Sequence, residues 1–100
     1  MKAPPELIAR VESLEIDFTE KAFAAALEKG YTRADVPEVY RTADFYKKTI
    51  DSREEADYVH AASGRDLRGK PAYTAGKELK DEQGPYWYVI TIHEAKKSVS

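Results

Sequence analysis

Two histidines are the first residues of this sequence to consider for chemistry, because histidine is a frequent general base and metal ligand. His60 follows Asp57 by three positions, and His93 directly precedes Glu94. A helix would place Asp57 and His60 on one face, but no spacing forces the two histidines to meet. Neighbouring strand residues point to opposite faces, so His93 and Glu94 do not pair. The chain has no cysteine, and we predict neither a metal site nor a bound cofactor.

A catalytic serine and a phosphate-binding loop are both disfavoured by their sequence context. Ser63 follows two alanines rather than the glycine of a strained nucleophile elbow. Segment 64–71 has two glycines and a lysine at the spacing of a phosphate loop, but Pro71 stands where that loop has serine or threonine. We therefore predict that the protein is not an enzyme. One alternative is a small enzyme that uses His60 or His93 as its acid–base group.

Basic and aromatic residues in the last third of the chain indicate a binding surface instead. Segment 64–80 holds five basic residues against two acidic ones, and segment 86–92 reads Tyr-Trp-Tyr-Val-Ile-Thr-Ile. Both alternating faces of the second segment are largely apolar, so a two-stranded hairpin would leave one face bare. Tyrosine, tryptophan and arginine are the residues that most often anchor protein interfaces. The predicted partner-binding residues are Arg65, Arg68, Lys70, Tyr73, Tyr86, Trp87 and Tyr88.

These residues predict a non-enzymatic protein-binding module, a regulator or inhibitor that occupies the surface of another protein. From the small size and high charge, one form of this prediction is a bacterial or phage-encoded inhibitor that blocks a nucleic-acid-handling complex. A nucleic-acid-binding regulator is an alternative, because the basic loop could neutralise phosphates and the tyrosines could stack on bases. The net charge of −2 gives no general attraction to nucleic acid. A homodimer formed through the hairpin is also left open.

Composition is typical of one small globular domain. The chain has 100 residues, of which 42% are hydrophobic and 34% charged, enough for one modest core under a charged surface. The first 20 residues lack an apolar run of signal-peptide length, and nowhere do about 18 apolar residues follow one another. Without cysteines for disulfides, we expect a cytoplasmic protein that has no membrane segment.

Prolines, glycines and apolar spacing predict helices over the first two thirds of the chain. Two prolines precede an apolar stripe over 7–18, and a second helix starts at a cap, Asp17 or Thr19, and ends at Gly30. The strongest helical spacing predicts a third helix over 36–50.

A fourth helix is predicted over 52–63 from the capping box of Ser52 and Glu55, although residues 57–60 are also compatible with an extended chain. After it, strand 86–92 pairs with a strand at 72–79 through a turn at 80–84.

The predicted fold class is α+β, with three to four N-terminal helices packed together and a C-terminal antiparallel β-hairpin. One domain covers 1–100, with a helical part at about 4–63, a loop and hairpin at about 64–94, and a frayed tail at 95–100. Helices that precede the strands argue against alternating parallel-sheet units.

Overall fold

The computed structural model describes residues 1–95 and contains more strand than the sequence predicts. Its helices are α1 (Pro5–Ser13), α2 (Glu20–Lys29) and α3 (Asp35–Arg41). Its strands are β1 (Glu15–Phe18), β2 (Phe45–Ile50), β3 (Tyr58–Arg65), β4 (Pro71–Asp81) and β5 (Gly84–Glu94). Within residues 1–95 these strands form one sheet in the order β1-β5-β4-β3-β2, antiparallel except for the parallel pair β1–β5. The predicted fold class, several helices followed by a separate hairpin, is therefore wrong.

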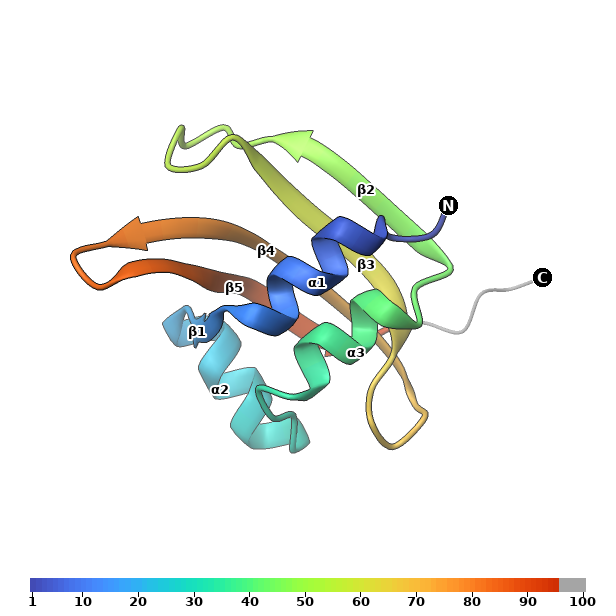
Figure 1. Cartoon of the computed structure of the whole chain (residues 1–100). Coiled ribbons are helices and arrows are strands. Elements are labelled where there is room, and N and C mark those ends of the chain that lie inside the picture. Colours follow the sequence, from blue (N-terminus) through green and yellow to red (C-terminus); the bar gives the residue numbers. More distant parts are fainter. Residues whose placement is uncertain (96–100) are drawn as a thin grey trace.

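All the helices described in residues 1–95 lie on one face of the sheet (Figure 1). Helix α2 packs on β5, α3 packs on β3, and α1 packs on α3. The core lies between these layers, where the rings of Tyr40 and Trp87 meet edge to face with centroids 5.7 Å apart. We call the helix-covered side the inner face and the opposite side the outer face.

The helix predicted over 36–50 ends at Arg41, and β2 takes its second half. Strand β2 pairs with β3 from Phe45 to Ile50. The helical stripe placed Ile50 in the core, but its side chain is 80% exposed. Aromatic and β-branched residues favour a strand when a partner strand is available, and local spacing does not report such a partner.

The helix predicted over 52–63 is also wrong, because a loop and then β3 occupy this segment. The side chain of Asp51, rather than a Ser52 cap, organises the loop. Its carboxylate accepts hydrogen bonds from the N–H groups of Arg53, Glu55 and Ala56 at 3.0–3.1 Å. Strand β3 then pairs with β2 on one side and β4 on the other, which supports the extended alternative for 57–60.

The apolar stripe over 7–18 is divided between two elements, since α1 ends at Ser13 and β1 follows. The predicted second helix is confirmed. Thr19 Oγ1 accepts the N–H of Ala22 at 3.1 Å, and Gly30 has the left-handed φ of 78°. The predicted hairpin is present as β4 and β5, but it is part of a larger sheet with a further strand on each side rather than a separate two-stranded unit.

The frayed tail predicted at 95–100 lies outside the described residues except for Ala95. The N–H of Ala95 donates to the carbonyl of Pro71 at 3.2 Å, which ties the end of β5 to the start of β4. Among residues 1–95, the structure contains no helix with the length and apolar character needed to cross a membrane.

Lys77 bridges the two hairpins where they separate. Strands β3 and β4 stop pairing at His60 and Gly76, and beyond this point β2–β3 and β4–β5 diverge (Figure 1). Lys77 Nζ donates to Asp51 at 3.0 Å and to Glu55 at 2.7 Å. The side chains of Lys77 and Asp51 are each only 3% exposed, so loss of Lys77 would leave the buried carboxylate of Asp51 without a cation.

Gly64 allows α3 to lie directly on β3. A Cβ atom at this position would stand 2.3 Å from the carbonyl oxygen of Val39 and 2.9 Å from the backbone nitrogen of Ala43. Glycine in a strand interior often marks such a close backbone approach. Gly64 therefore serves as a contact point between α3 and the sheet.

Replacement of Gly64 should test this contact. Gly64→Ala should lower the free energy of unfolding by about 3 kcal/mol, because backbone atoms must move to admit the methyl group. Gly30→Ala is the matched control, since only the left-handed backbone is unfavourable there, at a cost of about 1 kcal/mol. Urea denaturation measures both, and equal losses would contradict the close approach.

Asp51 should make the stability of the fold sensitive to acid. Burial raises the pKa of Asp51, but hydrogen bonds from Lys77, Arg53 and Ala56 outweigh this effect and lower the pKa to about 2. An unfolded aspartate titrates near pH ~3.9. The stabilisation is therefore complete above about pH 4 and is lost as the pH falls toward about 2.

Urea unfolding between about pH 6 and pH 2.5 measures this dependence. Asp51→Asn should be less stable at neutral pH and should lose less stability on acidification than the wild type. Glu82→Gln, which changes an exposed acid in the β4–β5 turn, is the control and should follow the wild type. Identical slopes for Asp51→Asn and the wild type would contradict the proposed origin of the acid sensitivity.

Candidate functional site: the acidic edge of the sheet

The aromatic segment that was predicted as a contact surface is divided between the two faces of the sheet. Trp87 points to the inner face, is 1% exposed and packs against Tyr40. Alternation along β5 directs Tyr86 and Tyr88 to the outer face, where both are half-buried. Their rings meet edge to face with centroids 6.2 Å apart. Trp87 is therefore a core residue, and the two tyrosines keep surface that a partner can contact.

The predicted basic residues lie in and beside the β3–β4 turn. Arg65 and Lys70 are exposed. Arg68 donates to the carbonyl of Lys29 at 3.1 Å and to the carboxylate of Asp66 at 3.3 Å. The buried Asp66 also accepts the N–H groups of Arg68 and Lys70, at 2.8 and 3.0 Å. Arg68 thus holds the turn against the end of α2.

Tyr73 belongs to the same end of the sheet as this basic turn. It pairs with His93 on the outer face, and the two rings stack with centroids 4.9 Å apart. Along β5, His93 stands five positions beyond Tyr88, roughly 15 Å at the usual rise of a strand. The basic turn and the pair Tyr86–Tyr88, which were predicted to form one surface, therefore lie at different ends of the molecule.

Tyr86 and Tyr88 stand beside two acidic residues of β1. In the parallel register Glu15 pairs with Tyr86, and Asp17 pairs with Tyr88. The carboxylates of both β1 residues are exposed. Burial raises the pKa of the Tyr86 hydroxyl, and the negative charges of Asp81 and Asp17 raise it further. Aromatic surface and negative charge thus occur together at this edge.

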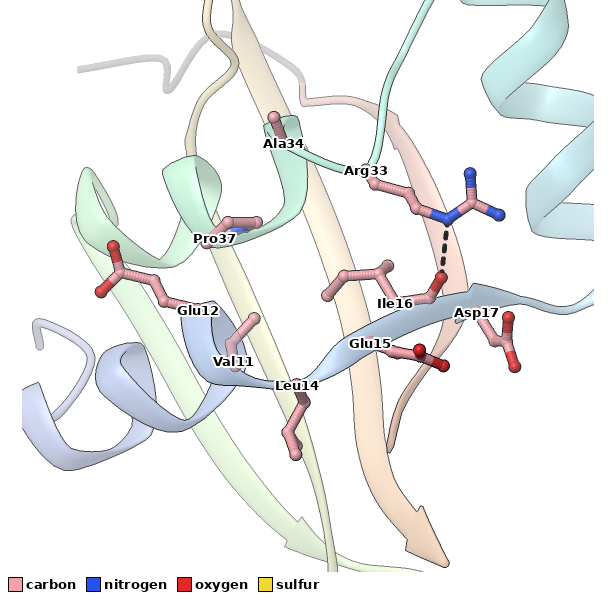
Figure 2. Close-up of a pocket in the computed structure, with 9 residues that line it drawn as sticks. All are labelled: Val11, Glu12, Leu14, Glu15, Ile16, Asp17, Arg33, Ala34 and Pro37. Atoms are coloured by element: carbon pink, nitrogen blue, oxygen red, sulfur yellow. Dashed lines mark hydrogen bonds between the residues drawn. The ribbon is translucent and has the colours of Figure 1, made fainter. Parts of the chain in front are cut away.

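A groove of about 560 Å³ runs along β1, between the end of α1 and the start of α3 (Figure 2). Its apolar lining comes from Val11, Leu14, Ile16, Ala34 and Pro37, and its charged lining from Glu12, Glu15, Asp17 and Arg33.

A second hollow of about 350 Å³ lies between β1 and the β4–β5 turn, and Glu15 and Asp17 also line it beside Tyr86. We call the surface around β1 the acidic edge, formed by Glu12, Glu15, Asp17, Asp81, Tyr86 and Tyr88.

Strand β1 is at the edge of the sheet, with β5 on one side. The N–H of Thr19 donates to Val89 at 3.0 Å, so alternation directs the backbone groups of Asp17 toward β5 and those of Ile16 toward the open edge. The carbonyl of Ile16 accepts a hydrogen bond from Nε of Arg33 at 2.8 Å (Figure 2). The side chain of Arg33 thus makes the hydrogen bond that the backbone of a neighbouring strand would otherwise make to Ile16.

The two histidines lie on opposite faces of the sheet. His60 is half-buried on the inner face, with Nδ1 2.7 Å from the hydroxyl of Tyr46 and its ring centroid 5.5 Å from that of Trp87. Burial lowers the pKa of His60, and the charge of Lys48 lowers it further. His93 is exposed on the outer face. In residues 1–95 no three His, Asp or Glu side chains are grouped as metal ligands.

Sequence reasoning missed Glu15, Asp17 and Arg33 as site residues. Glu15 was predicted to lie on the exposed side of the first helix, and Asp17 was predicted as a possible cap of the second helix. The available signal was the alternation of polar and apolar residues over Glu15–Phe18, which has the period of a half-buried strand. It was missed because four residues also fit the helical stripe that precedes them.

Comparison with family models, curated proteins and solved structures finds no significant match to this chain. Function is therefore inferred from the chemistry of the acidic edge.

The position of the single tryptophan can be tested by fluorescence. Because Trp87 is sealed between the sheet and α3, acrylamide should quench its emission several-fold less in the folded protein than in protein unfolded by urea. Equal quenching in the two states would place Trp87 on the surface and contradict the division of the aromatic segment described above.

Proposed function

We propose that this chain is a non-enzymatic protein-binding module whose acidic edge occupies a basic surface of a partner protein. The observation that carries this proposal is the register of β1 and β5, which places Glu15 beside Tyr86 and Asp17 beside Tyr88. Tyrosines supply apolar contact area with a polar tip, and they are enriched where interfaces are strongest. The adjacent carboxylates select partners that carry lysine or arginine.

The carboxylates of β1 are available for such a contact. Glu12 is paired with Arg41, and Glu78 is paired with Arg10. Among residues 1–95, by contrast, neither Glu15 nor Asp17 takes part in an ion pair within 4 Å. Exposed charges of this kind accelerate the encounter with an oppositely charged surface, and this effect weakens with salt.

Basic protein surfaces include those that bind nucleic acid. A module that covers such a surface with carboxylates and tyrosines would act by exclusion, as a regulator or inhibitor of a nucleic-acid-handling complex. We keep the cytoplasm as the expected compartment, because the chain has no cysteine for disulfides.

The alternatives have less support in the geometry. A nucleic-acid-binding regulator would need the basic turn and the tyrosines Tyr86 and Tyr88 on one surface, but the fold separates them. The carboxylates beside these tyrosines also repel phosphate. The hairpin strands β4 and β5 each have neighbours on both sides, so a homodimer formed by their edges is not part of the proposal. A small enzyme based on either histidine would have to work without the other, since they face opposite sides.

Matched variants can test the function by affinity capture from source cells. The immobilised wild type should retain a basic protein that Asp17→Lys and Tyr88→Ala each fail to retain. Arg65→Ala and Lys70→Ala, at the distant turn, should retain it as the wild type does. With the purified partner, Tyr88→Ala should raise Kd about tenfold or more, the range of an interface anchor. The proposal would be refuted if only the turn variants failed to retain the partner protein, or if the wild type captured nucleic acid that salt releases.

A further inference from the structure

We propose that the partner joins the sheet, with an extended segment of its chain adding as a further strand along the open edge of β1. This inference rests on the proposed function and specifies how the acidic edge is used. Strand addition to an exposed edge is a general mode of peptide recognition, in which backbone hydrogen bonds give affinity and alternate side chains give specificity.

The backbone of Ile16 supplies the first contact. Its carbonyl faces the groove, and Arg33 Nε reaches it at 2.8 Å, which shows that a donor fits at this position (Figure 2). Arg33 itself is exposed, and its guanidinium lies 5.8 Å from the ring centroid of Phe18. An exposed side chain can be displaced at small cost, so Arg33 protects the edge until a strand replaces it.

The side chains around β1 define the segment that would fit. On the outer face, alternate residues of an added strand would stand next to Glu15 and Asp17, where lysine or arginine is favoured. On the inner face, the intervening residues would lie over Val11, Leu14 and Pro37, which favour apolar side chains. The expected ligand is therefore a short extended segment in which basic and apolar residues alternate.

A second copy of this chain fits the edge less well. Two β1 strands placed edge to edge would oppose the carboxylates of Glu15 and Asp17 from both copies, which is destabilising. The other edge strand, β2, offers Lys47 on its outer face, but its inner face carries the buried Tyr46 and the charged Lys48. Pairing of β1 with β2 would thus bring a cation to the apolar part of the groove.

Three synthetic peptides test strand addition directly. The first is a capped heptapeptide, Thr-Lys-Val-Lys-Val-Lys-Thr, and the other two carry N-methyl groups either on the lysines or on the valines. A strand presents only alternate N–H groups to its neighbour. One methylated peptide should therefore bind more than tenfold more weakly than the parent, and the other should bind nearly as well. Isothermal titration gives the Kd values, and the ¹⁵N–¹H signal of Ile16 should shift with the peptides that bind.

Variants of the protein complete the test. Arg33→Ala should bind the unmethylated peptide several-fold more tightly, because it frees the carbonyl of Ile16 and removes a like charge. Arg65→Ala, which removes an exposed arginine at the distant turn, is the matched control and should not change the affinity. Asp17→Lys should abolish binding.

Equal affinities of the two methylated peptides, or no binding of the parent peptide, would overturn strand addition. The proposed function would still stand if the captured partner protein depended on Asp17 and Tyr88, and it would fail if that dependence were missing. Analytical ultracentrifugation of the wild type tests whether a second copy of this chain occupies the edge instead. A dimer that Lys47→Glu dissociates would assign the edge to β2 of a second copy and overturn the inference.

Discussion

The parallel pairing of β1 with β5 is the constraint on which the surface of this protein depends. It brings a four-residue segment near the start of the chain alongside the last strand, and it sets the register in which Asp17 stands beside Tyr88. Because side chains alternate across a sheet, the same pairing seals Ile16 and Trp87 beneath the helices. Core packing and surface chemistry at this edge are therefore two consequences of one register.

The remainder of the fold keeps that edge in place. Gly64 lets α3 settle on β3, and α3 in turn carries Tyr40 against Trp87. On β4, beside Tyr88 of β5, Lys77 holds the diverging hairpins together through two carboxylates of the β2–β3 loop. The Lys77–Asp51 pair is buried, and the contact at Gly64 leaves no room for a side chain. The charges of Glu15 and Asp17 at the acidic edge are exposed. The buried residues that stabilise the fold thus differ from the exposed residues of the proposed contact surface.

Charge is distributed unevenly over the sheet, although the chain as a whole is nearly neutral. Glu15 and Asp17 lie at the β1 edge, and Arg65 and Lys70 lie by the β3–β4 turn. The sequence places the basic residues and the tyrosines close together along the chain, which led to the prediction of one mixed surface. The fold separates them because the two hairpin turns on either side of β4 are at opposite ends of an eleven-residue strand.

Local signals were sufficient for the elements that depend on nearby residues. The second helix was predictable because Thr19 and Gly30 satisfy its ends with their own side chain and backbone. The hairpin of β4 and β5 was predictable because its strands are joined by a short turn. In the candidate site, Tyr86 and Tyr88 were identified from their residue types, whereas their acidic neighbours on β1 were not.

The sequence by itself determined one cysteine-free domain, its second helix and its central hairpin, because these follow from composition and from contacts between near neighbours. Only the tertiary structure decided that residues 45–50 and 58–65 are strands, that Trp87 is core, and that β1 forms an exposed acidic edge. Each of these outcomes requires a strand partner far away in the chain. Residue spacing within a segment carries no information about such a partner. A short amphipathic segment can fit both the helical and the strand period, and pairing with another strand then decides between them.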